Sequence, residues 1–195
     1  RDAYWRHGSV CECYSDIEVP VLAIDGWADS YTNTVLSLME GLSVPRKGII
    51  GPWAHVYAHD GAPGPAMNFL GEGVRWWDHW LKGAENGIMD GPMVDVWVED
   101  SMPPCSHRPE SEGRWVGLEA WPSETVAETP LYLSAGRLSG KAAGPETATL
   151  RTPLNHGLLA NEWMGAGVPG ESPCDQRLDN GLSMCFDGDG LAEPL

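Results

Sequence analysis

Residues 17–29 read IEVPVLAIDGWAD, and residues 47–55 read KGIIGPWAH. Each begins as a short apolar run and reaches a glycine, a pattern typical of a buried parallel strand that enters a tight turn. We predict strands over residues 19–24 and 47–50. Between them, apolar side chains recur at helical spacing, which predicts an amphipathic helix closed by Gly41 and Pro45; they are Val35, Leu38, Met39 and Leu42.

A second helix is predicted after the Pro- and Gly-rich loop at residues 61–65. One stripe of its surface is apolar and is formed by Phe69, Leu70, Val74, Trp77, Trp80 and Leu81. Asp78 and Lys82 are four residues apart, a favourable helix pair, and Gly83 stands where a C-cap is expected. The order strand, helix, strand, helix requires crossover connections, so residues 1–90 are predicted to be α/β with a parallel sheet.

The sequence changes character after Gly91. Runs with a period of two residues follow one another between clusters of Gly, Pro and Ser, at residues 93–98, 114–118, 131–133, 147–150 and 183–186. No helix is expected there, and the pattern favours a β-sandwich or jelly roll. We therefore predict a domain boundary near Gly91, with an all-β unit over residues 91–195.

Composition excludes several classes of partner. The chain has 195 residues, 42% of them hydrophobic, which is enough for a core. Its formal charge of -16 repels nucleic acid and anionic membranes, so neither is an expected partner. No apolar stretch approaches the ~20 residues of a membrane span, and no export signal is visible. Five irregularly spaced cysteines fit free thiols better than a disulfide framework, which favours a cytoplasmic location.

Asp29 and His55 are the candidate catalytic pair. Each follows one of the two predicted strands, and the carboxyl ends of neighbouring parallel strands meet at one edge of a sheet. Either residue alone is more often a turn residue or a helix cap. Together they match the acid and histidine of an α/β-hydrolase triad, whose chain order is nucleophile, acid, histidine. The acid would hold the imidazole in one tautomer while the histidine accepts the proton of the nucleophile.

The motifs around this pair resemble a known family. Gly26-Trp27-Ala28-Asp29 and Gly51-Pro52-Trp53-Ala54-His55, followed by the Trp-rich segment 76–83, are similar to the C-terminal half of the CocE/NonD hydrolases, a group that includes cocaine esterase and the X-Pro dipeptidyl-peptidases. The resemblance implies that Asp29 is the triad acid and His55 the triad histidine. It also implies an α/β-hydrolase domain followed by a jelly roll, as the two halves of the sequence indicate.

The nucleophilic serine of that family has no counterpart here. Only Ser9 and Ser15 precede Asp29, and neither has a glycine two positions ahead. We therefore expect a piece of a longer chain, truncated at both ends, whose serine and oxyanion donors lie upstream and which is inactive alone. The predicted function is hydrolysis of a small ester, amide or short peptide. The alternative is a non-catalytic β-sandwich binding module attached to a decayed hydrolase scaffold.

The resemblance also suggests residues for substrate binding. Tyr31 would line the pocket, and Trp27 and Trp53 would shape it, although aromatic residues at these positions also commonly seal strand ends against a core. His55 and His59 are four residues apart, but no glutamate stands beside either, so no metal or cofactor is predicted. The sequence leaves open a homo-oligomer of the longer protein.

Overall fold

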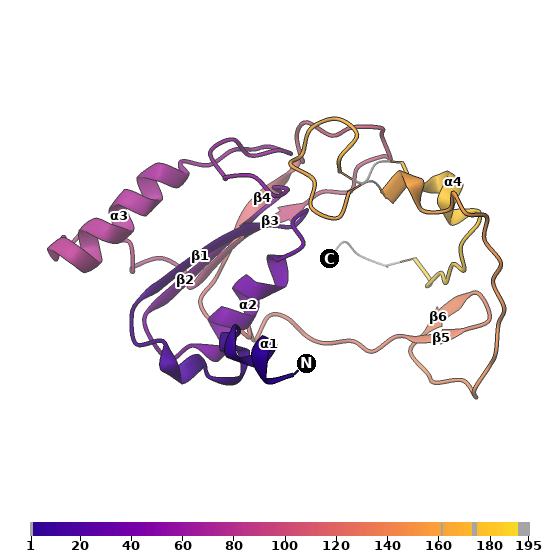
Figure 1. The fold of residues 1–195 in the computed structure, drawn as a ribbon, viewed down its shortest axis with the longest axis horizontal. Coiled ribbons are helices and arrows are strands. Elements are labelled where there is room, and N and C mark those ends of the chain that lie inside the picture. The colour runs from indigo at the N-terminus through magenta and orange to yellow at the C-terminus, as the bar shows by residue number, and fades with distance from the viewer. Residues whose placement is uncertain (1, 161, 173–174, 191–195) are drawn as a thin grey trace.

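The computed structural model of the protein describes residues 2–160, 162–172 and 175–190. Its largest element is a four-stranded sheet with the strand order β1-β2-β3-β4 (Figure 1). The strands are β1 (Val21–Gly26), β2 (Arg46–Gly51), β3 (Val94–Glu99) and β4 (Gly113–Leu118). The helices are α1 (Ala3–His7), α2 (Thr32–Gly41), α3 (Phe69–Lys82) and α4 (Arg177–Asn180), with short 3-10 turns at Val10–Glu12, Tyr14–Asp16 and Leu158–Ala160.

β1 and β2 confirm the two predicted strands. They pair in parallel, with Val21 beside Arg46 and Gly26 beside Gly51. β1 begins two residues later than predicted because Pro20, which has no backbone N–H, cannot join the ladder. The carboxyl ends of both strands therefore meet at one edge of the sheet.

The core lies between the sheet and α2, the helix that connects β1 to β2. Met39 of α2 and Ile50 of β2 are both fully buried, and Val35 is 3% exposed. They pack with Val94 and Val96 of β3 in one cluster. A second, smaller cluster, formed by Ile49, Trp53 and Ala58, includes the partly buried Phe69 at the start of α3.

α3 confirms the predicted second helix and ends at the predicted C-cap, Gly83. The Asn68 side chain accepts a hydrogen bond from the backbone N–H of Gly71, and Gly83 ends the helix with φ of 70°. Most of the apolar stripe is exposed, although such a stripe usually faces a core. Trp76 is buried, whereas Leu70, Val74, Trp77 and Leu81 are 57–73% exposed, because the described residues place no partner against that face.

The sheet continues across the boundary predicted near Gly91. β3 lies parallel to β2, with Val94 beside Gly48, and β4 pairs antiparallel with β3. The strands just after Gly91 therefore extend the sheet of the first half. A hydrophobic pattern predicts that a strand forms but does not identify its partner strand, so this continuity could not be predicted from the sequence.

A jelly roll is not formed by the described residues after β4. That part holds one two-stranded hairpin, β5 (Tyr132–Ser134) with β6 (Arg137–Ser139), turned at Gly136 with φ of 70°. The predicted strands at 147–150 and 183–186 are irregular, and the short helix α4 was not expected. Period-two runs of three or four residues bury too little apolar surface to fix a strand without a second layer packed on them.

No helix among the described residues has both the length and the apolar character of a membrane span.

Gly26 brings the ends of β1 and β2 unusually close. Its Cα faces the backbone of Trp53, and a side-chain Cβ at this position would collide with the Trp53 carbonyl. The backbone N–H groups of Trp27 and Ala28 donate to Gly51 O at 2.8 Å and to Trp53 O at 3.0 Å. Two successive loops are thus held together by direct backbone contacts.

Replacing Gly26 by alanine should separate these loops. We expect Gly26→Ala to lower the free energy of unfolding by about 1–3 kcal/mol, since overpacking against rigid backbone is relieved only by moving one loop. The matched control is Gly73→Ala in the middle of α3, where a Cβ meets nothing within 4 Å. That change should stabilise by about 0.5–1 kcal/mol. Urea unfolding of both variants checks this, and equal effects would contradict the packing argument.

Candidate active site

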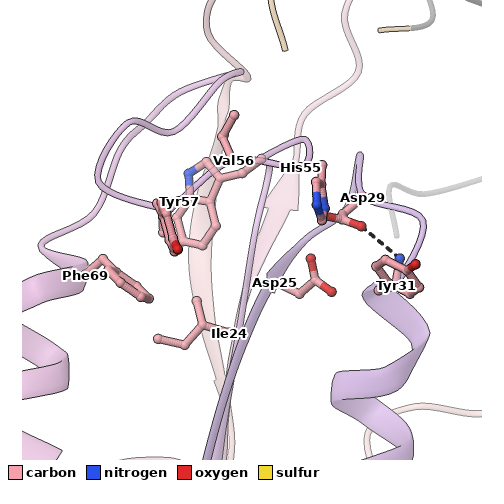
Figure 2. A pocket seen from close by; sticks show the side chains of 10 residues that line it. Ile24, Asp25, Asp29, Tyr31, His55, Val56, Tyr57 and Phe69 are labelled. Carbon is pink, nitrogen blue, oxygen red and sulfur yellow. Dashed lines mark hydrogen bonds and ion pairs between the residues drawn. The ribbon is translucent and has the colours of Figure 1, made fainter. Parts of the chain in front are cut away.

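Asp29 and His55 lie in direct contact at the carboxyl edge of the sheet. His55 Nδ1 is 2.7 Å from Asp29 Oδ2. The Asp29 side chain is only 6% exposed, whereas that of His55 is 49% exposed. The other carboxylate oxygen, Oδ1, accepts a hydrogen bond from the backbone N–H of Tyr31 at 2.9 Å, the dashed line in Figure 2. The carboxylate is therefore fixed at both oxygens and shielded from water.

The sequence around each residue explains how it reaches this position. β1 ends at Gly26, and the backbone N–H of Asp29 donates back to Gly26 O at 3.1 Å, so the chain turns before α2 begins. After β2, the backbone N–H of His55 donates to Gly165 O at 3.0 Å. This last contact comes from the second half of the chain, and no motif in the sequence indicated it.

This geometry suits proton transfer. An aspartate that accepts from Nδ1–H leaves Nε2 as the basic nitrogen of the imidazole, and it stabilises the imidazolium once Nε2 takes a proton. A buried carboxylate does this more effectively than an exposed one, because solvent screens the charge less. The exposed side of His55 is where a nucleophile or a leaving group can approach.

A cavity of about 480 Å³ opens beside the pair. Figure 2 shows that its lining has two characters. The polar end is formed by Asp25, Asp29, Tyr31 and His55, and the apolar end by Ile24, Val56, Tyr57 and Phe69. The volume lies within the range of small-molecule sites, which is about 300–1,000 Å³.

The three predicted substrate residues lie in different places. Tyr31 lines the cavity, with its ring centroid 6.1 Å from that of His55. Trp53 also borders it, but the ring is 1% exposed and its Nε1–H donates to Pro65 O at 2.7 Å, as in a core residue. Trp27 does not line this cavity, because its Nε1–H donates to Trp97 O at 2.6 Å and holds the indole toward β3.

Asp25 lines the cavity and was not among the predicted residues. It is the fifth residue of β1, and its Oδ1 accepts from the backbone N–H of Gly26 at 2.8 Å. Burial raises the pKa of Asp25 above its ordinary value of 3.8, and the neighbouring Asp29 carboxylate raises it further. The signal was present in the sequence: a carboxylate interrupts the otherwise apolar run VLAIDG.

Tyr57 and Phe69 were also missed as lining residues. Tyr57 follows His55 by two positions, and Phe69 was assigned to the helix stripe. His59, weighed as a metal partner of His55, stacks instead on Tyr57 and Phe69, with ring centroids 5.6 and 5.7 Å apart. Within the described residues, no group of three or more His, Cys, Asp or Glu is placed to hold a metal ion.

Sequence models of two protein domains match the chain. Residues 1–57 match the X-Pro dipeptidyl-peptidase (S15 family), and residues 86–195, more than half of the chain, match the X-Pro dipeptidyl-peptidase C-terminal non-catalytic domain. The first match contains both Asp29 and His55.

Similar curated proteins are named as Xaa-Pro dipeptidyl-peptidases or as serine esterases. A predicted Xaa-Pro dipeptidyl-peptidase from Bacillus cereus is 34% identical over 94 residues, 47% of this chain and 13% of that protein. A predicted serine esterase from Mycobacterium bovis is 30% identical over 144 residues, 69% of this chain and 20% of that protein. The chain thus spans a fifth or less of the length of these relatives.

Solved structures agree on the fold. The CocE/NonD family hydrolase SACOL2612 from Staphylococcus aureus superposes with a TM-score of 0.53 at 19% identity, covering 72% of this chain and 24% of that one. A second structure of the same protein gives a TM-score of 0.52 at 20% identity. The chain therefore shares the fold of a CocE/NonD family hydrolase. Because the second domain model matches more than half of its length, the chain belongs to the X-Pro dipeptidyl-peptidase family of hydrolases.

Proposed function

We propose that this chain supplies the acid and the base of a serine hydrolase triad, Asp29 and His55, within a longer protein whose serine precedes it. The observation that carries the proposal is the 2.7 Å contact of His55 Nδ1 with a carboxylate that is 6% exposed. An ordinary ion pair on the protein surface contributes little to stability and is not buried in this way.

The proposed reaction follows from the geometry. The serine Oγ attacks the carbonyl carbon of a small ester, amide or short peptide, and its proton passes to His55 Nε2. The tetrahedral intermediate collapses, the bond from carbon to the leaving oxygen or nitrogen breaks, and His55 returns the proton to the leaving group. Water, activated by His55, then attacks the acyl-enzyme, and the proton goes back to the serine oxygen.

The binding-module alternative gains no support from the described residues. A β-sandwich needs two packed sheets, and β5 and β6 form a two-stranded hairpin whose residues Tyr132 and Leu133 are 42% and 63% exposed. A cavity of about 480 Å³ lies instead beside His55. We therefore place the function at the carboxyl edge of the four-stranded sheet.

Asp25 also supports a functional site at this edge of the sheet, because its position is unfavourable for folding. A carboxyl group that is partly buried next to a second carboxylate opposes folding once it is ionised. Groups with perturbed pKa values cluster at functional sites, because folding alone would not select them. The position of Asp25 in the cavity lining thus supports the same location for the site.

Substitution of the pair should abolish the activity of the serine. In the longer protein, Asp29→Asn and His55→Ala should each slow labelling by a fluorophosphonate by about 10³-fold or more, because the serine loses its proton acceptor or the acceptor loses its orientation. The rate of labelling is the measurement. Asp16→Asn and His107→Ala, exposed residues of the same types, are the controls. Labelling that is unchanged in both site variants would reject the triad.

Asp25→Asn should stabilise the protein at neutral pH. Since the folded pKa of Asp25 lies above the unfolded value of 3.8, the unfolded chain loses its proton first as the pH rises. Stability is therefore lost from pH ~3.8 upward and is not regained at pH 7. Asparagine cannot ionise and still accepts from the Gly26 N–H.

The test is the urea midpoint of both proteins at pH 3 and pH 7. The midpoint of the variant should exceed that of the wild type at pH 7, and the difference should shrink at pH 3, where both states of the wild type hold the proton. A variant that is less stable than the wild type at pH 7 would contradict the prediction, because it would show that the ionised Asp25 carboxylate stabilises the fold.

A further inference from the structure

Three aromatic rings gather at the apolar end of the cavity. Tyr57, His59 and Phe69 lie within 5.6–5.8 Å of one another by ring centroids. Tyr57 and Phe69 line the cavity, and Figure 2 shows them on the side away from Asp29 and Tyr31. We call these three residues the aromatic wall.

The aromatic wall is anchored to the core at Phe69, although much of it is exposed. Phe69 packs on the buried cluster of Ile49, Trp53 and Ala58. Backbone hydrogen bonds fix the adjoining loop, from Asp60 N–H to Tyr57 O and from Met67 N–H to Ala58 O, both at 2.8 Å. Tyr57 nevertheless remains 68% exposed. A group of aromatic rings that is anchored to a core and open to a cavity is a surface suited to binding.

The position of His55 indicates which part of a substrate meets the wall. Tyr57 follows the histidine by two residues, and Val56 lies between them in the cavity lining. A histidine that returns its proton to the leaving group must lie within hydrogen-bond reach of the leaving atom. The group attached to that atom therefore lies close to His55, and the cavity lining beside His55 continues with Val56 and Tyr57.

From this arrangement we infer that the aromatic wall binds a flat, apolar leaving group, such as the benzyl alcohol of a benzyl ester. The inference rests on the proposed function and adds the substrate class. Rings stack on aromatic side chains at centroid distances of 4.5–7 Å, and the cavity of about 480 Å³ has room for one such ring. In the step concerned, the bond from the acyl carbon to the benzyl oxygen breaks, and the proton of His55 passes to that oxygen.

The experiment compares three esters on the longer protein: benzyl acetate, ethyl acetate and ethyl phenylacetate. The first carries its ring on the leaving group, the third on the acyl group, and the second carries none. For Tyr57→Ala we expect a fall of about tenfold in kcat/KM for benzyl acetate, appearing mainly in KM, because a binding contact is lost. The other two esters should change less than twofold.

Two further variants distinguish a specific loss of binding from a general loss of structure. Tyr57→Phe keeps the ring and should retain the preference for benzyl acetate. Tyr4→Ala removes a tyrosine of similar exposure, 78%, that lies in α1 and does not line the cavity, and should leave all three esters unchanged.

Each remaining outcome overturns the inference in a distinguishable way. Equal losses on all three esters in Tyr57→Ala would show a structural role for the ring, while the triad still stands. A loss confined to ethyl phenylacetate would place the wall on the acyl side. If the wild-type protein hydrolyses none of the esters and takes no fluorophosphonate label, the proposed function fails and the inference fails with it.

Discussion

The close approach of the Gly26 backbone to the backbone of Trp53 is the contact on which the rest of the arrangement depends. Parallel pairing sets Gly26 beside Gly51, and each strand then needs only a few more residues to reach Asp29 or His55. A side chain at position 26 would push the two loops apart. The 2.7 Å contact between carboxylate and imidazole exists because the backbone is already in place, and little side-chain freedom remains to be lost when it forms.

Much of this edge of the sheet could be predicted from sequence. The runs VLAIDG and KGIIG form strands because they are apolar, short and ended by glycine, and α2 and α3 form because apolar residues recur at helical spacing. The contact between Asp29 and His55 followed from the order of the strands. The hydrogen bond from His55 N–H to Gly165 O could not be anticipated, since it joins distant segments through backbone atoms that carry no sequence pattern.

The predictions that failed share a physical cause. The stripe on α3 and the runs at 147–150 and 183–186 have the periodicity of buried elements, but periodicity describes only one side of an interface. Whether Leu70 or Trp77 is buried depends on a partner surface, and the described residues do not provide one. Phe69 is a different case: it belongs to the predicted apolar stripe and packs on a buried cluster, yet it also lines the cavity. An aromatic residue at the margin of a core has the same sequence signature in either role.

The hydrogen bond from His55 N–H to Gly165 O bears on whether the two matched domains can function independently of each other. The matched domain that begins at residue 86 is described as non-catalytic, yet one of its carbonyls anchors the loop that carries the histidine, and its buried Gly167 packs against Ala62 of the same loop. β3 and β4 of that domain also complete the sheet. Replacing residues 86–195 by the same domain of a relative would therefore also replace residues that position His55.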